Sequence, residues 1–231
     1  MSGTKAVFRL VPPALVVLVV TAFPSLGPPV RVEGPIPFVG PRPYFQMPVA
    51  CGEIWKLDTY STHDDFDIDF MPTTGSAWGR PIYASFNGRV VRAGLSGTLG
   101  QRTEANPKGP SGTGAGYSVV LDHGQGWRTY YFHMIDMPMV HTGQRVTTGQ
   151  QLGKVGSTGK SGAPHIHYEQ LMYGAWKAGK WGKVESYFDG VPSGITSDGN
   201  PSTGPLYVDD EMSPPRHRES KNCGTAQTLE P

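Results

Sequence analysis

Residues 116–134, GYSVVLDHGQGWRTYYFHM, contain two runs of strand-forming residues on either side of the turn sequence Gly-Gln-Gly. Valine, tyrosine, tryptophan and phenylalanine suit the pleated surface of a half-buried sheet. A glycine-containing turn between two such runs is typical of an antiparallel β-hairpin. This stretch therefore predicts a hairpin whose second strand ends at His133.

The segments around this hairpin carry further strand signals. FDIDF, at residues 66–70, alternates apolar and acidic side chains, which is the period of a strand with one buried face. RPIYAS and NGRVVRAG meet at Asn87-Gly88, which predicts another hairpin turn. No long helical period of apolar residues occurs before residue 170. The predicted fold is therefore mostly β and antiparallel, with residues 95–116 as a long glycine-rich loop.

The two ends of the chain differ in composition from its middle. Residues 1–27 hold an uncharged apolar stretch behind two basic residues and are predicted to be a signal peptide, with a retained N-terminal anchor as the alternative. Residues 28–50 are proline-rich and predict a linker or extended arm. The globular domain is expected at residues 51–190, followed by a polar tail at residues 191–231.

Composition and cysteine usage limit the partners and the compartment. The chain has 20 basic and 19 acidic residues with a net charge of +1 and no long basic run, which argues against a nucleic-acid partner. A monomer is expected, in contact with a membrane only if the N-terminal segment is not cleaved. Cys51 and Cys223 are its two cysteines. In an exported protein they are expected to form a disulfide that ties the tail back.

The stretch GAPHIHYEQ, at residues 162–170, places two histidines one residue apart. Side chains at positions i and i+2 of a strand lie on the same face, so His165 and His167 would share a face, with Ile166 directed into a core. Two adjacent nitrogen donors suit a metal site or an acid–base site. The alternative is a packed or surface histidine pair without chemistry.

A second polar cluster lies in STHDDFDIDF, where His63 is followed by four aspartates. If residues 66–70 form a strand, Asp67 and Asp69 lie on its polar face. A histidine and a carboxylate are suitable ligands for Zn²⁺. Spacing alone does not choose among Asp64, Asp65, Asp67 and Asp69, and a solvated acidic turn is the alternative.

The order of these motifs resembles the M23 family of zinc metallopeptidases, the lysostaphin-type peptidoglycan endopeptidases. That family carries H-x-x-x-D, then Y-x-H, then a glycine-rich block ending in H-[LI]-H-[FY]-E. Residues 143–169 follow the last block almost position by position. The resemblance covers about residues 60–172. It departs at Asp65, where the family often has glycine. It implies a compact antiparallel sheet with a groove walled by loops.

The resemblance also implies roles for individual residues. His63, Asp67 and His167 would bind one Zn²⁺ and leave a fourth position for water. His133 and His165 would orient or deprotonate that water and stabilise the charged intermediate. Residues expected to support the ligands, without a choice among them, are Ser118, Tyr130 and Glu169.

The activity implied is that of an exported zinc endopeptidase that hydrolyses peptide bonds of peptidoglycan. Such an enzyme would be secreted or associated with the bacterial cell wall. One alternative is a non-catalytic M23-like module that binds or regulates another hydrolase. A second alternative is a zinc peptidase that acts on glycine-rich proteins.

Overall fold

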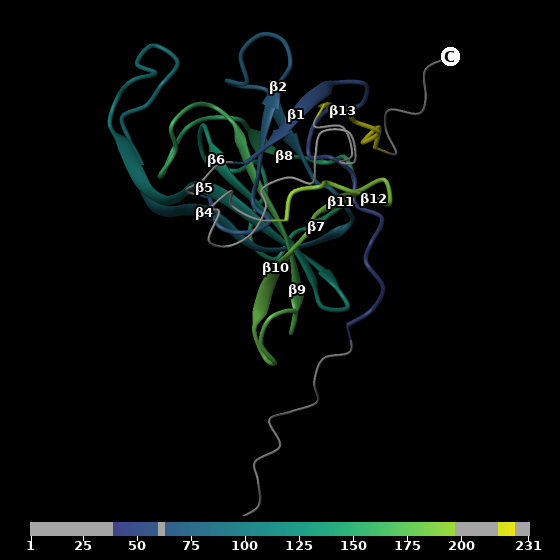
Figure 1. The fold of residues 1–231 in the computed structure, drawn as a ribbon. Coiled ribbons are helices and arrows are strands. Elements are labelled where there is room, and N and C mark those ends of the chain that lie inside the picture. The colour runs from purple at the N-terminus through teal and green to yellow at the C-terminus, as the bar shows by residue number, and fades with distance from the viewer. Residues whose placement is uncertain (1–38, 60–62, 197–216, 225–231) are drawn as a thin grey trace, which may run out of the picture. The chain divides into compact units, whose positions relative to one another are not determined.

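The computed structural model describes residues 39–59, 63–196 and 217–224, and Figure 1 shows the arrangement of their strands. All described residues belong to one compact unit.

Several predicted segments fall outside the described residues. They are the predicted signal peptide at residues 1–27, residues 28–38 of the arm, and residues 197–216 and 225–231 of the tail. Within the part of the chain that is described, no helix has the length and apolarity that a membrane span requires.

One nine-stranded sheet dominates the fold, and each pairing in it is antiparallel. The spatial order is β13-β1-β2-β9-β6-β5-β4-β7, with β10 added to β9 beside that path. Its strands are β1 (Ile54–Asp58), β2 (Ile68–Pro72), β4 (Gly88–Gly100), β5 (Ser111–Gly124), β6 (Trp127–Met134), β7 (Arg145–Val146), β9 (Ile166–Tyr173), β10 (Trp181–Val184) and β13 (His217–Glu219). Two small sheets pair β3 (Pro81–Tyr83) with β8 (Gln151–Lys154), and β11 (Tyr187–Phe188) with β12 (Val191–Pro192). The prediction of a mostly β, antiparallel domain is confirmed.

The hairpin predicted at residues 116–134 forms the centre of the sheet as β5 and β6. Gly124 pairs with Trp127 across its turn. The two residues between them have positive φ values, 49° at Gln125 and 77° at Gly126. A two-residue turn with φ above zero at both central positions matches the right-handed twist of the flanking strands. The sequence therefore predicted this pairing for the right physical reason.

The hairpin predicted at Asn87-Gly88 is wrong. Its two strands exist, but β3 pairs with β8 and β4 pairs with β5 and β7, so the two strands lie in different sheets. The side-chain oxygen of Asn87 accepts a hydrogen bond from Thr148 N at 2.8 Å. Asn87 therefore joins this corner to a segment far along the chain, and the chain passes from one sheet to the other there.

The loop predicted at residues 95–116 is mostly strand. β4 continues to Gly100 and β5 begins at Ser111, so the connection is only residues 101–110. The strand signal was hidden because this segment has few apolar side chains. Its glycines allow close backbone contact: a Cβ atom on Gly97 would lie 2.0 Å from Thr113 O.

The two faces of the sheet separate apolar from polar side chains, as the alternation predicted. Ile166 and Tyr168 of β9 belong to the buried core, with Ile68 and Phe70 of β2. The residues between and around them, including His167, face the opposite side. That opposite face carries the candidate site.

The described part of the arm, residues 39–50, packs on the core. Phe45, Met47 and Val49 are each at most 1% exposed. The core therefore includes side chains that precede residue 51, where the globular domain was expected to begin. The expected disulfide between Cys51 and Cys223 is confirmed, with Cα atoms 4.6 Å apart.

Candidate active site

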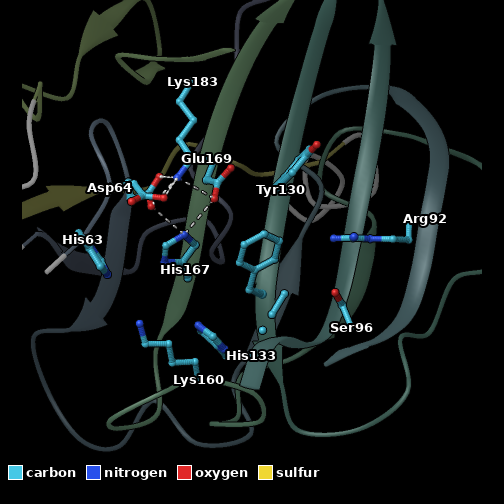
Figure 2. A pocket seen from close by; sticks show the side chains of 14 residues that line it. His63, Asp64, Arg92, Ser96, Tyr130, His133, Lys160, His167, Glu169 and Lys183 are labelled. Carbon is cyan, nitrogen blue, oxygen red and sulfur yellow. Dashed lines mark hydrogen bonds and ion pairs between the residues drawn. The ribbon is translucent and has the colours of Figure 1, made fainter. Parts of the chain in front are cut away.

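A groove of about 490 Å³ lies over the polar face of the large sheet (Figure 2). Its lining includes His63, Asp67, His133 and His167, which are four of the five predicted site residues. The fifth, His165, is 4% exposed and its ring centroid lies 4.9 Å from that of His133. The groove expected from the family resemblance is thus present, with four of the five residues lining it and His165 packed beside His133.

A buried carboxylate, Asp69, lies at the point where three histidines meet. Its Oδ2 is 3.3 Å from His63 Nε2. Its Oδ1 is 3.3 Å from His167 Nδ1 and 3.2 Å from His165 Nε2. Strand pairing produces this arrangement, because Asp69 of β2 stands directly opposite His167 of β9. Donor atoms of His63, Asp69 and His167 all lie within 4.8 Å of one another.

Asp67, the carboxylate expected as a ligand, lies at the other edge of the His167 ring. Its Oδ2 is 3.5 Å from His167 Nε2 and accepts a hydrogen bond from Lys183 Nζ at 2.8 Å. Asp67 precedes β2 and follows Phe66, which has a φ of 66°. The structure therefore brings Asp67 into the site but places Asp69, not Asp67, beside His63.

Glu169 contacts the outer nitrogen of His167. Its Oε1 is 3.2 Å from His167 Nε2. A carboxylate that accepts the Nε2 proton makes Nδ1 the nitrogen available to a metal ion, which is how outer partners orient metal-binding histidines. Phe132 stacks on the same imidazole with ring centroids 5.0 Å apart and planes 4° apart. Together they fix the orientation and the plane of the His167 ring.

Lys183 is a site residue that the sequence reading missed. It lies on β10, beside β9, and its Nζ is 3.1 Å from Asp64 Oδ2 and 3.4 Å from Glu169 Oε1. Figure 2 shows it over the carboxylates that surround His167. The signal was absent because β10 is a short strand whose position beside β9 no local pattern reveals.

His133 and His165 present the same tautomer to the groove. Each Nδ1 lies 2.7 Å from a backbone carbonyl oxygen, that of Thr158 for His133 and that of Ala163 for His165. A carbonyl oxygen only accepts, so Nδ1 carries the proton and Nε2 is the basic nitrogen. His133 also has a φ of 62°, a conformation that is uncommon for residues other than glycine and concentrates at functional sites.

The electrostatics of the site favour the charged forms of Asp69, an anion, and of His167, a cation. Burial alone would raise the pKa of Asp69, but its close contacts with the imidazoles of His165, His167 and His63 hold that pKa well below its usual range. Burial alone would lower the pKa of His167, but its hydrogen bonds to Asp69 and Glu169 raise it to about 10. The buried carboxylates therefore attract a cation.

The pKa shifts of two neighbouring groups, His133 and Asp67, favour the neutral form of each. Burial lowers the pKa of His133 to about 3, and the charges of His165 and His167 act in the same direction. Burial raises the pKa of Asp67 to about 6. At neutral pH His133 is therefore uncharged.

The residues present fit a zinc ion. Two imidazole nitrogens and one carboxylate oxygen are the donor set of a catalytic zinc with an open position. Asp69 Oδ1 and His165 Nε2 are buried and lie 3.2 Å apart, yet neither makes a hydrogen bond of acceptable geometry within the described residues. Unsatisfied buried polar atoms are rare in folded proteins and indicate an absent partner such as an ion or water.

Comparisons with known proteins relate part of the chain to peptidases. Residues 68–178 match the model of Peptidase family M23. Over 96 residues, 42% of this chain and 18% of the relative, the chain is 35% identical to peptidoglycan DD-endopeptidase ShyA of Vibrio cholerae. Over 107 residues, 46% of this chain and 24% of the relative, it is 30% identical to glycyl-glycine endopeptidase ALE-1 of Staphylococcus capitis. The chain thus spans less than a quarter of the length of these curated relatives.

A solved structure of the antimicrobial peptidase lysostaphin from Staphylococcus simulans is 24% identical with a TM-score of 0.38, over 60% of this chain and 46% of that one.

The residues matched by the family model, 68–178, contain Asp69, His133, His165 and His167 and begin after His63 and Asp67. Residues 68–178 of the chain therefore resemble a domain of Peptidase family M23.

Proposed function

We propose that the protein is a zinc-dependent endopeptidase that hydrolyses peptide bonds of peptidoglycan. The observation that carries the proposal is the meeting of His63 Nε2, His167 Nδ1 and the Asp69 carboxylate in the groove of a domain that resembles Peptidase family M23. His63, Asp69 and His167 are proposed as the ligands, with Asp69 in the place for which Asp67 was expected. The relative ShyA, named a peptidoglycan DD-endopeptidase, supports the substrate class.

The chemistry divides between the ion and the protein. A bound zinc would polarise the scissile carbonyl and make its water acidic enough to ionise near neutral pH. His165 and His133 are the proposed proton carriers, because their Nδ1–H groups are held by carbonyls and their Nε2 atoms are free to accept. One takes a proton from the attacking water, and the protonated imidazole then stabilises negative charge or gives the proton to the departing amine.

The charges of the groove support a charged peptide substrate. Arg92 and Lys160 are exposed and line the same groove as Glu169. Arg92 pairs with Val120, Val120 with Tyr130, and Tyr130 with Glu169. Three strand spacings, ~14 Å, therefore separate the basic end from the acidic end. Figure 2 shows Arg92 and Glu169 on either side of Tyr130.

Stem peptides of peptidoglycan carry free carboxylates that an exposed guanidinium can bind. A glycine-rich protein segment offers Arg92 no side-chain charge. The groove therefore favours peptidoglycan peptides over the glycine-rich alternative. The non-catalytic alternative is disfavoured because degenerate modules lose metal ligands, whereas His63, Asp69 and His167 lie together here with His133 and His165 beside His167.

An exported location, secreted or associated with the cell wall, is part of the proposal. The disulfide Cys51–Cys223 supports it, since such bonds persist in oxidising compartments.

The test is release of new amino groups from purified peptidoglycan by the zinc-loaded protein. We expect release that a chelator abolishes, that added zinc restores, and that His165→Ala eliminates. His141→Ala is the matched control, because His141 is exposed and lies outside the groove lining. Absence of release by folded, zinc-loaded protein would reject the peptidase, and release that persists in His165→Ala would reject the assigned site.

A further inference from the structure

The carbonyls that hold His133 and His165 belong to one segment, residues 157–163, here named the anchoring loop. Thr158 O accepts from His133 Nδ1 and Ala163 O accepts from His165 Nδ1. The Thr158 hydroxyl also donates to Met134 O at 2.7 Å. The position of this loop therefore sets the tautomer and the ring orientation of both proposed proton carriers.

The anchoring loop is held by the outer part of the β4–β5 hairpin, residues 95–116, here named the outer hairpin. The backbones of the hairpin and the loop are joined by hydrogen bonds. Gly112 N donates to Gly159 O at 2.8 Å, and Gly159 N donates to Leu99 O at 3.1 Å. Lys160 N donates to Gly114 O at 2.8 Å. The loop thus pairs with both strands of the outer hairpin.

Two side chains of the outer hairpin complete this attachment. Ser161 N donates to Ser111 Oγ at 3.0 Å, and Arg102 Nη1 donates to Gly162 O at 2.7 Å. These contacts fall directly before Ala163, whose carbonyl holds His165. Each is made by a residue that lies outside the groove lining.

At Gly116 and Gly159 the backbones of the outer hairpin and the anchoring loop lie too close together for a side chain to fit between them. A Cβ atom on Gly116 would lie 2.3 Å from Thr158 Oγ1 and 2.5 Å from Thr158 O, the carbonyl that holds His133. A Cβ atom on Gly159 would lie 2.3 Å from Gly116 N. Both glycines have positive φ, 62° and 77°. The glycine content of this segment therefore serves close packing against the loop.

We infer that the outer hairpin is a positioning element for the reaction, acting through the anchoring loop on His133 and His165. Arg102 and Ser111 are positioning residues in this scheme and touch neither the reacting atoms nor the proposed ligands. The inference rests on the proposed function for its kinetic consequence. Its structural consequence, the tautomer of the two histidines, does not depend on activity.

The test uses the full chain with Arg102→Gln and Ser111→Ala combined, and Lys108→Gln as the control. Lys108 is exposed in the connection of the same hairpin, and no contact between it and the loop occurs among the described residues. We expect kcat to fall about tenfold or more with KM within about twofold, because small misplacements of catalytic groups are costly. Zinc content and Lys108→Gln kinetics stay at the wild-type level.

Nitrogen chemical shifts of the histidine rings provide the second readout. In wild type, His133 and His165 should both show the Nδ1–H tautomer, and the double variant should show mixed tautomers. Wild-type tautomers and unchanged kcat in the double variant would overturn the inference. A wild-type protein that lacks peptidase activity would reject the proposed function, while the tautomer measurement would still decide on the hairpin.

Gly116→Ala is a second variant that removes no hydrogen-bonding group. We expect it to displace Thr158 O and to change the His133 tautomer more than that of His165, because the three atoms nearest the added methyl all belong to Thr158. Equal tautomer signals in Gly116→Ala and wild type would also overturn the inference.

Discussion

At the scale of single residues, the site depends on which of two neighbouring carboxylates faces His63. Asp67 and Asp69 both lie on the polar side of the chain near β2, but they contact opposite edges of His167. Only Asp69 also contacts His63 and His165. Asp67 instead contacts Lys183, which already supplies it with a positive charge.

This difference predicts opposite outcomes for two equivalent substitutions. Asp69→Asn removes the proposed ligand, so the zinc affinity should fall by more than the ~10–100-fold typical of outer-shell changes. Asp67→Asn should keep one zinc per chain. The measurement is zinc content after dialysis against a weak chelator, with circular dichroism as the folding control. Zinc loss in Asp67→Asn with retention in Asp69→Asn would restore Asp67 as the ligand.

Arg92 gives a second prediction at this scale. Arg92→Gln should lower kcat/KM about tenfold for a cross-linked stem peptide with a free carboxylate, because hydrogen bonds to charged groups contribute about 1.5–3 kcal/mol. The same peptide with that carboxylate amidated should lose less than about twofold. Arg89→Gln is the control, since Arg89 lies on the same strand but lines a different pocket. Equal losses on both peptides would exclude carboxylate recognition by Arg92.

At the scale of elements, His123 connects the end of β5 to the corner at Asn87. Its Nδ1 lies 2.8 Å from Asn87 O, and its Nε2 lies 2.8 Å from Thr129 Oγ1 on β6. Burial lowers the pKa of His123 to about 4. The folded state therefore excludes a proton that the unfolded chain binds at an ordinary pKa near 6.5.

The sign of the resulting pH effect follows from this depressed pKa. Above pH 6.5 His123 is neutral in both states and its full contribution to the unfolding free energy is present. As the pH falls from 6.5 toward 4, the unfolded chain binds the proton and the unfolding free energy decreases by on the order of 2 kcal/mol. Urea unfolding between pH 7.5 and 4.5 measures it. His123→Gln should show a shallower decline than wild type, and His141→Gln should show the wild-type decline. Parallel curves for wild type and His123→Gln would contradict the assignment.

Alternation along single strands could be predicted from the sequence, and pairing between distant strands could not. The period of two placed His165 and His167 on one face and Ile166 on the other, as observed. The choice of Asp69 over Asp67 depends on the register between β2 and β9, which neither strand encodes alone. Lys183 reaches the site only because β10 adds to β9, and glycine-rich strands at residues 95–116 lacked apolar side chains to reveal them.

At the scale of the whole described domain, the arm and the C-terminal segment meet on the core. Asn222 Nδ2 donates to Met47 O at 2.8 Å, and Ser220 Oγ donates to Val49 O at 2.9 Å. The disulfide Cys51–Cys223 joins the same two segments across a sequence separation of 172 residues. None of these residues lines the groove over the polar face of the sheet. The contacts that join the two ends of the domain therefore lie apart from the proposed site.

This separation predicts that loss of the disulfide affects stability without affecting catalysis. The double variant Cys51→Ser with Cys223→Ser should lower the unfolding free energy by about 2–5 kcal/mol, because the unfolded chain is no longer cross-linked. Its kcat at a temperature where it stays folded should match wild type within about twofold. Reductant should shift the urea midpoint of wild type toward that of the variant and leave the variant unchanged. A double variant that keeps the wild-type urea midpoint but loses kcat would contradict this separation. Such a result would show that the disulfide-linked segments around Cys51 and Cys223 affect the groove, because only a change in the site could lower the rate without lowering the stability.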